Sequence, residues 1–592
     1  MPADPPLPRR AVGAVAGLFR LRPSPPRWPN GARAAISAAI PILIGWAAGD
    51  LGAGLIATLG AFTCRFGSGR PYRNRDVQLA AIGAALATAI TLGAWAAPVI
   101  WLAVGVVSAI AVVAVWVCSA LEVGPPGAYV FVIVCAAGIG VSASHLPPWH
   151  IGLLVLAGAA IAWTTQMVGV LVDPRGPEKA AVSAAGDAVA TAIEHAGSVD
   201  AGLARGRAAE ALYRAWTILV GHQAATVPTG GTLDRLRQAT HALHVLFADA
   251  MRAAALGLPV PDGAVDTARG LAALTIDPAT VGRRDPDRAA LRQPRAPELL
   301  RHAVTPGAHT RRVMVRVAIA APVAGALAAL VGAGHIYWAI AAAVLVLHLG
   351  MDRRGTLQRG VERLAGTWIG LALAAGILLI HPQGVWLALV VAALQFAIET
   401  TVTRNYVLAS IFITAAALTV SSASHPVDVG GVLVDRGLDT LIGCSVGVAV
   451  FLLASARQES DRVPAAVADV LRRVAVVAGH LAGDGPGTVA AREARRTLQR
   501  AAMDLSVARE AARGGSPRQR MAADRLDTTV TAAEGLAYLA ITTCWSVDRG
   551  GPDPMRAADA AEYRATLDSL ADRVATGEVV ASQLAALDPR MH

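Results

Sequence analysis

The chain has 592 residues, of which 54% are hydrophobic and only 16% are charged. A soluble protein carries about 25% charged residues, so this composition indicates a membrane protein. The formal net charge of +10 would also suit a nucleic-acid-binding protein. However, the arginines cluster beside apolar segments, where they set membrane topology, and nucleic acid is not an expected partner.

Lysine and cysteine usage excludes several chemical classes of site. Lys179 is the only lysine, and it lacks the glycine spacing of a phosphate-binding loop, which excludes an ATP-binding motif of that kind. The five cysteines form no CxxC pair, and four of them lie in apolar stretches. Neither a disulfide framework nor a zinc site is supported, and we expect no cofactor and no metal.

The chain begins with a Pro- and Arg-rich arm, residues 1–32, which we expect to be cytosolic because its apolar stretch is too short for a secretory signal. Residues 33–172 form a first apolar block. Its hydrophobic runs lie at about 34–49, 51–64, 77–97, 99–120, 127–145 and 148–172. Several runs approach the roughly 20 residues that span a bilayer, which predicts six transmembrane helices.

A polar segment follows the first apolar block, and a second apolar block and a second polar segment come after it. Residues 173–310 are charged and Ala-rich, with leucines at helical spacing, and are predicted to form a cytosolic helical bundle. Residues 311–456 form a second apolar block with runs at about 313–332, 335–350, 364–381, 383–400, 404–424 and 430–455. Residues 457–592 are predicted to form a second cytosolic bundle. The expected fold class is therefore all-α, with two six-helix transmembrane blocks that are each followed by a helical bundle.

The connections between the apolar runs alternate between arginine-rich and arginine-free segments. The positive-inside rule places the arginine-rich connections in the cytoplasm. Heavy use of Arg, Ala and Gly is typical of a GC-rich bacterial genome. We therefore expect a multi-pass protein of the bacterial plasma membrane with both termini cytoplasmic.

The two apolar blocks resemble each other in sequence. RAAISAA, which begins at Arg33, resembles RVAIAA at Arg316, and a SASH segment ends at both His145 and His425. The offset is about 280 residues in each case. An even number of spans in each block orients both copies alike, which predicts a parallel repeat with a transport path between the halves.

Two pairs of glycines with a spacing of four residues predict close helix–helix contacts. Gly366 and Gly370 form one pair, and Gly443 and Gly447 form the other. The second pair also matches the GxSxG pattern of serine hydrolases, but it lies in an apolar run with no preceding strand. We therefore expect no catalytic residue and do not expect an enzyme.

The strongest candidate for chemistry is a charged cluster, Asp435-Arg436-Gly-Leu-Asp439, at the start of the last apolar run. Ionisable groups in membrane spans usually face a cavity or one another. Arg436 is either an anion-binding residue, with Asp435 or Asp439 as a proton-accepting partner, or part of an ion pair that locks helices. Tyr337 and Trp338 are either an interfacial aromatic belt or a stacking surface for a planar substrate.

Three arginines lie where two hydrophobic runs meet: Arg354, Arg359 and Arg363. They are either topological anchors or a basic cytosolic vestibule that concentrates anions. Further candidate polar groups of the site are Gln395, Glu399, Asn405 and Tyr406.

Residues 335–440 carry the segments HIYWAI, RGTLQR, RLAGT and NY, followed by Arg436 and then Asp439-Thr440. Together these motifs resemble the fusaric acid resistance / aromatic acid exporter family. The first block, with GAFT from Gly60 and YRNR from Tyr72, resembles a diverged copy that lacks the Trp and the late Arg-Asp. The resemblance implies an inner-membrane exporter of small, often aromatic, organic acids that does not hydrolyse ATP. One half is also similar to plant malate channels.

The expected function is therefore secondary export of small aromatic or amphiphilic organic acids, with the lipid bilayer and an anionic substrate as partners. Two alternatives stay open. One is a passive anion channel, and the other is a membrane scaffold whose two bundles recruit envelope-biosynthesis proteins. A homo-oligomer and envelope proteins are further candidate partners.

Overall fold

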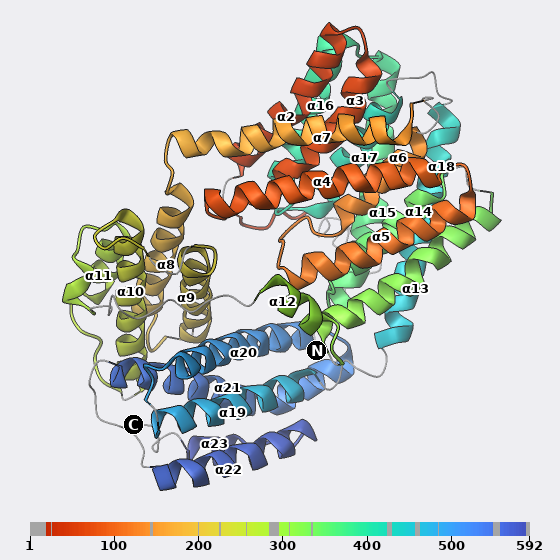
Figure 1. Cartoon of the computed structure of the whole chain (residues 1–592). Coiled ribbons are helices and arrows are strands. Elements are labelled where there is room, and N and C mark those ends of the chain that lie inside the picture. The colour runs from red at the N-terminus through yellow and green to blue at the C-terminus, as the bar shows by residue number, and fades with distance from the viewer. Residues whose placement is uncertain are drawn as a thin grey trace, which may run out of the picture. The chain divides into compact units, whose positions relative to one another are not determined.

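The structure is a computed structural model (Figure 1) that describes residues 19–24, 27–141, 146–198, 200–223, 227–255, 257–282, 295–306, 308–332, 335–422, 429–455, 462–483, 485–548 and 557–587. All secondary-structure elements in these ranges are helices, so the all-α prediction is confirmed. The SASH segments, apart from Ser422, and most of the arm 1–32 lie outside the described residues.

The chain divides into two compact units. The first, here called the membrane unit, comprises Met1–Ser68, Arg75–Val172 and Pro294–Ser455. The second, here called the polar unit, comprises Gly69–Asn74, Asp173–Gln293 and Ala456–His592. Seven helices in the described ranges are long and apolar enough to cross a membrane, and four further apolar helices are shorter. The prediction of a multi-pass membrane protein is thus confirmed.

Helices occupy all six apolar runs of the first block. They are α2 (Trp28–Ala47), α3 (Leu51–Thr58), the 3₁₀ helix η1 (Leu59–Arg65), α4 (Tyr72–Ala96), α5 (Ile100–Ala120), α6 (Tyr129–Val141), α7 (Pro148–Met167) and the 3₁₀ turn η3 (Val168–Leu171). The short second run is capped by Asp50, whose Oδ1 accepts a hydrogen bond of 2.9 Å from the Ala53 amide. This cap satisfies a backbone donor that the first turn of α3 would otherwise leave without a partner.

The second apolar block forms α13 (His309–Leu330), α14 (Tyr337–Leu347), α15 (Arg353–Ile380), α16 (Gly384–Thr401), α17 (Tyr406–Ser422) and α18 (Val429–Ser455). α15 begins 11 residues before the apolar run 364–381, because Asp352 caps it by accepting from the Gly355 amide at 2.9 Å. With 28 residues, α15 is about 42 Å long and exceeds the hydrocarbon thickness of a bilayer. Its first turns therefore carry the arginines beyond the apolar part of the helix.

The helices of the two apolar blocks pack crosswise within the membrane unit. α2 packs against α16, and α13 packs against α5. Within the blocks, α7 packs against α3 and η1, while α18 packs against α14 and α15. Val107 and Ala111 of α5 belong to the same apolar core as Val317 and Ala320 of α13. The short helix α12 (Ala296–Ala303) lies beside α5, where the Trp116 indole donates to the Leu300 carbonyl at 3.0 Å.

The polar unit contains two groups of helices that each share an apolar core. The first group is α8 (Gly176–Glu194), α9 (Ala201–Trp216), the π-helical turn η4 (Thr217–Gly221), α10 (Thr232–Ala255), α11 (Ala264–Ala272) and the 3₁₀ turn η5 (Pro278–Thr280). The second group is α19 (Arg462–Leu481), α20 (Val489–Arg513), α21 (Pro517–Val547), α22 (Ala557–Ala575) and α23 (Ala581–Ala585). α10 packs against α21, and α9 packs against α20.

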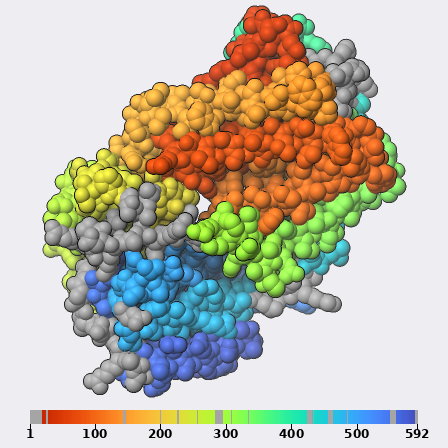
Figure 2. All heavy atoms as spheres, in the orientation of Figure 1, coloured from red at the N-terminus to blue at the C-terminus, as the bar shows by residue number. Residues whose placement is uncertain are grey.

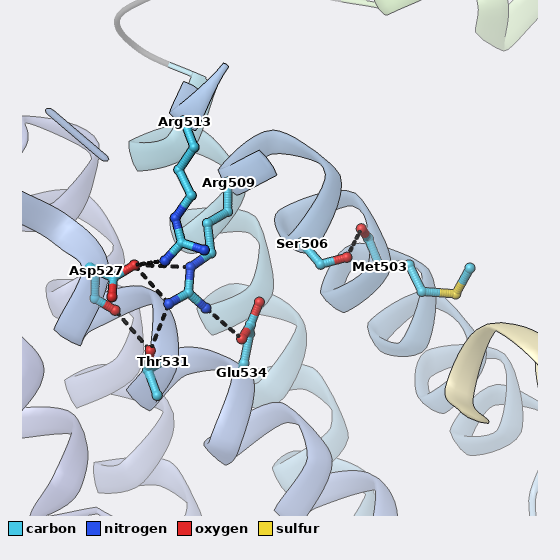
Figure 3. A network of polar contacts seen from close by, with 7 residues as sticks. All are labelled: Met503, Ser506, Arg509, Arg513, Asp527, Thr531 and Glu534. Carbon is cyan, nitrogen blue, oxygen red and sulfur yellow. Dashed lines mark hydrogen bonds and ion pairs between the residues drawn. The ribbon is translucent and has the colours of Figure 1, made fainter. Parts of the chain in front are cut away.

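An ion-pair network joins α20 to α21 in the polar unit (Figure 3). The Arg509 guanidinium lies 2.7 Å from Asp527 Oδ1 and 3.3 Å from Glu534 Oε2, and Arg513 lies 2.8 Å from Asp527 Oδ1. Burial raises the pKa of Glu534 above its ordinary value, although the Arg509 charge acts to lower it. Burial also acts to raise the pKa of Asp527, but the hydrogen bonds and charges of Arg509 and Arg513 together hold that pKa below its ordinary value.

Arg509→Ala should lower the stability of the α20–α21 contact by about 1–2 kcal/mol, because it leaves the partly buried Glu534 without its ion-pair partner. Hydrogen–deuterium exchange of peptides from α20 and α21 in the full chain measures this local opening. Arg513→Ala serves as the control, since Arg513 is half-exposed and contacts Asp527 alone among the described ion pairs. Equal exchange rates in the two variants would show that the network does not hold these helices together.

Candidate functional site

Arg436 is a deeply buried charged group of the predicted cluster. It lies on α18 and is 3% exposed. Its guanidinium carbon is 3.1 Å from the ring centroid of Trp338, which lies at the start of the neighbouring helix α14. The structure thus brings together two residues almost 100 positions apart that the sequence singled out separately. A desolvated cation–π contact of this kind contributes about 2 kcal/mol.

Polar atoms of Arg436 and Asp439 are buried without protein partners. Nε and Nη1 of Arg436 and both carboxylate oxygens of Asp439 have no hydrogen-bond partner among the residues that the structure describes. Within the same ranges, neither Asp435 nor Asp439 forms an ion pair with Arg436. Buried charged groups without such partners carry a desolvation cost, which an incoming polar ligand would offset.

A line of aromatic contacts leads from His335 to this site. His335 Nδ1 lies 3.7 Å from Asp435 Oδ2, and its ring meets the Tyr337 ring edge-on at 5.8 Å. Tyr337 in turn contacts Trp338 with ring centroids 5.6 Å apart. The predicted residues Tyr337, Trp338, Asp435 and Arg436 therefore belong to one connected cluster.

The three arginines of α15 differ in burial. Arg354 is exposed, Arg359 is half-buried, and Arg363 is 2% exposed. The Arg359 guanidinium carbon lies 3.7 Å from the ring centroid of Tyr406, and Arg363 Nη1 donates to Ser410 Oγ at 3.2 Å. The three arginines thus lie at increasing depth in the membrane unit, and Arg359 also lies 3.9 Å from Glu362 Oε2.

Tyr129 of the first block is a site residue that the sequence analysis did not propose. It lies at the start of α6 and is buried, and its ring stacks on the His348 ring at 6.0 Å between centroids. It is within electrostatic range of Arg363, Tyr406 and Arg436. A sequence signal for it exists, because a Tyr-Val dipeptide begins both the segment at Tyr129 and the segment at Tyr406.

Residues 323–450, which include all of these second-block residues, match the family model described as fusaric acid resistance protein-like. The resemblance to this family is confirmed. The chain is also 25% identical over 498 residues to the "uncharacterized membrane protein YvaC" of Bacillus subtilis (strain 168), an alignment that covers 78% of each chain. No solved structure matches the chain significantly.

Three other predicted polar groups of the fusaric acid resistance-like region lie apart from the Arg436 cluster. Asn405 caps α17 by accepting from the Leu408 amide at 3.0 Å, and its Nδ2 donates to the Arg20 carbonyl at 3.3 Å. Gln395 and Glu399 on α16 bind Arg65, at 2.7 Å and 3.1 Å respectively. The contacts of Gln395 and Glu399 therefore join the second block to the first, and the contact of Asn405 joins it to the arm 1–32.

The four predicted packing glycines of this region lie in helix–helix contacts. A Cβ on Gly366 would lie 2.5 Å from Ser410 Cβ, and one on Gly370 would lie 2.7 Å from the Ile411 carbonyl oxygen, both on α17. Gly443 and Gly447 face α14 in the same way. These glycines let α17 and α14 approach the helices that carry Arg363 and Arg436.

No group of three or more His, Cys, Asp or Glu in the described ranges could hold a metal ion. His241 and His244, which are three residues apart on α10, both contact the Trp545 ring of α21. Burial lowers the pKa of His244 to about 4. These two histidines thus take part in the packing of the polar unit.

Proposed function

We propose that this protein is a secondary transporter that exports small organic acids, and that Arg436 binds the carboxylate of the substrate. The observation that carries the proposal is the buried Arg436 guanidinium, which stacks on Trp338 while its Nε and Nη1 lack partners among the described residues. Arginine presents planar, paired donors that match the two oxygens of a carboxylate. Tyr337 and Trp338 offer aromatic surface beside that position, which suits an aromatic acid.

Asp439 gives this proposed site a means of coupling to protons. Its carboxyl group is buried three residues from Arg436 and has no hydrogen-bond partner in the described chain. A carboxyl group at membrane depth readily exchanges its charge for a proton. Protonation of Asp439 would leave the Arg436 charge free to hold an anion, and deprotonation would favour release of that anion.

The helix packing supports a duplicated membrane unit, with α2–α7 and α13–α18 as parallel repeats. The first helix of each repeat packs against the fourth of the other, and the second packs against the sixth within each repeat. Such reciprocal contacts are what an axis relating two copies produces. With the arginine-bearing ends in the cytoplasm, residues 173–310 and 457–592 would both be cytosolic, and Arg354 would face the side from which the substrate is taken.

Arg436→Ala should reduce efflux of radiolabelled benzoate from proteoliposomes at least tenfold, because loss of a buried charged contact costs more than about 1.4 kcal/mol. The matched control is Arg311→Ala, which removes an exposed arginine at the start of α13. Protein amount, insertion and orientation are compared by protease protection. Unchanged efflux through a correctly inserted Arg436→Ala variant would remove this assignment.

The row from Arg354 through Arg359 and Arg363 to Arg436 favours a second candidate function, passive anion conduction. A line of positive groups along a path lowers the barrier to anions throughout its length. Steady benzoate currents in planar bilayers that do not depend on a pH gradient would favour the channel over the transporter. Absence of both flux and current, with partners retained through the polar unit, would favour a scaffold.

A further inference from the structure

Arg363 is a second deeply buried arginine that the Arg436 site does not use. Arg363 Nη1 donates a hydrogen bond to Ser410 Oγ, and Nε of Arg363 has no hydrogen-bond partner among the described residues. It forms no ion pair with any described carboxylate. A guanidinium that is 2% exposed and lacks a counter-ion carries a desolvation cost that an anionic ligand would offset.

Two arginines of the first block have oxygen acceptors in the protein. Arg65 lies 3.1 Å from Glu399, and Arg75 Nη1 donates to the Gln166 carbonyl at 3.4 Å. Arg363 instead faces a hydroxyl, which compensates a positive charge far less than a carboxylate does. Arg363 thus differs from Arg65 and resembles Arg436, which also lacks an ion pair with a described carboxylate.

Residues that carry hydroxyl groups lie near Arg363 on two helices besides its own. Ser410 and Tyr406 belong to α17, and Tyr129 belongs to α6 of the first block. The Tyr129 hydroxyl is buried and has no hydrogen-bond partner within the described ranges. Both tyrosines lie within electrostatic range of Arg363. A guanidinium together with hydroxyl donors is a set of groups that recognises small oxyanions.

A glycine in the sequence makes this arrangement possible. Gly366 lies one turn after Arg363 on α15, and a Cβ there would lie 2.5 Å from Ser410 Cβ. The absence of a side chain at Gly366 therefore lets α17 bring Ser410 within hydrogen-bond distance of Arg363.

The Arg363 and Arg436 charges act on each other but occupy different places. Arg363 lies ten residues, or about 15 Å, from the start of α15, whereas Arg436 lies on α18 against Trp338. We propose that Arg363, Ser410, Tyr129 and Tyr406 form a second anion-binding station, which takes the carboxylate of the same small organic acid. This inference rests on the proposed function, and two stations close together would hasten release because their bound anions repel each other.

Equilibrium binding of radiolabelled benzoate to the full chain in lipid nanodiscs tests the proposal. We expect two equivalents in the wild type, one in Arg363→Gln, one in Arg436→Gln and none in the double variant. Tyr129→Phe should weaken one of the two equivalents three- to tenfold and leave the other unchanged. Arg311→Gln, which removes an exposed charge, should keep both equivalents, and thermal melting checks that each variant is folded.

The outcomes separate this inference from the proposed function. One wild-type equivalent that is lost in Arg436→Gln and kept in Arg363→Gln would overturn the second station and leave the Arg436 site standing. Two equivalents of which only Arg363→Gln removes one would support the station and overturn the Arg436 assignment. Unchanged binding in Tyr129→Phe, with both equivalents kept in a folded Arg363→Gln variant, would also overturn the station.

Discussion

Gly443→Ala should lower the stability of the membrane unit by about 3 kcal/mol, because the added methyl group has no room. Its Cβ would lie 2.1 Å from the Ala339 carbonyl oxygen and 2.7 Å from Ala342 Cβ on α14. A backbone oxygen cannot move without the helix that carries it. α14 also carries Trp338, so the displacement should disturb the contact between Trp338 and Arg436 as well as the packing.

A graded series of glycine variants provides the controls for this prediction. At Gly447, which also faces α14, an added Cβ would lie 3.1 Å from the nearest atom, so alanine should cost much less. At Gly376 on α15, no heavy atom lies within 4 Å, and alanine should be neutral or stabilise by up to about 1 kcal/mol. Thermal melting with size-exclusion chromatography ranks the three variants. Identical melting of Gly443→Ala and Gly376→Ala would contradict the close packing of α14 and α18.

Glu399→Ala should destabilise the membrane unit by about 3–5 kcal/mol, because it leaves the buried Arg65 without its carboxylate. The Arg65 side chain is 11% exposed, and Arg27 lies 3.6 Å from the same carboxylate. Gln395 still accepts from Arg65 at 2.7 Å, so the effect should lie at the lower end of this range. Thermal unfolding in nanodiscs measures the loss.

The double variant Arg65→Met/Glu399→Leu distinguishes an ion pair from simple packing. Removing both charges abolishes the unpaired buried group, so the double variant should recover most of the stability that Glu399→Ala loses. If its loss instead equals the sum for the two single variants, Arg65 and Glu399 do not interact in the way that their 3.1 Å separation indicates.

Much of the membrane unit could be predicted from the sequence because its signals are local. A long apolar run must satisfy its backbone within a helix once it enters a bilayer, so the runs that form α4, α5 and α16 are visible without tertiary information. Arg436 and Trp338 could also be singled out from the sequence, because each is a polar or aromatic residue at the edge of an apolar run. The start of α15 was missed because its first turns are polar, and only the Asp352 cap marks that they are helical.

The sequence by itself determined that this chain is an all-helical membrane protein with a fusaric acid resistance-like region, and which charges enter its apolar runs. Only the tertiary structure decided which of those charges are paired. Glu399 neutralises Arg65 some 330 positions away, whereas Arg363 meets Ser410 and lies near Tyr129 instead of a carboxylate. These contacts depend on how α6, α15, α16 and α17 pack. The helical period of a sequence shows which face of its own helix a residue occupies, but not which side chains of another helix lie opposite that face.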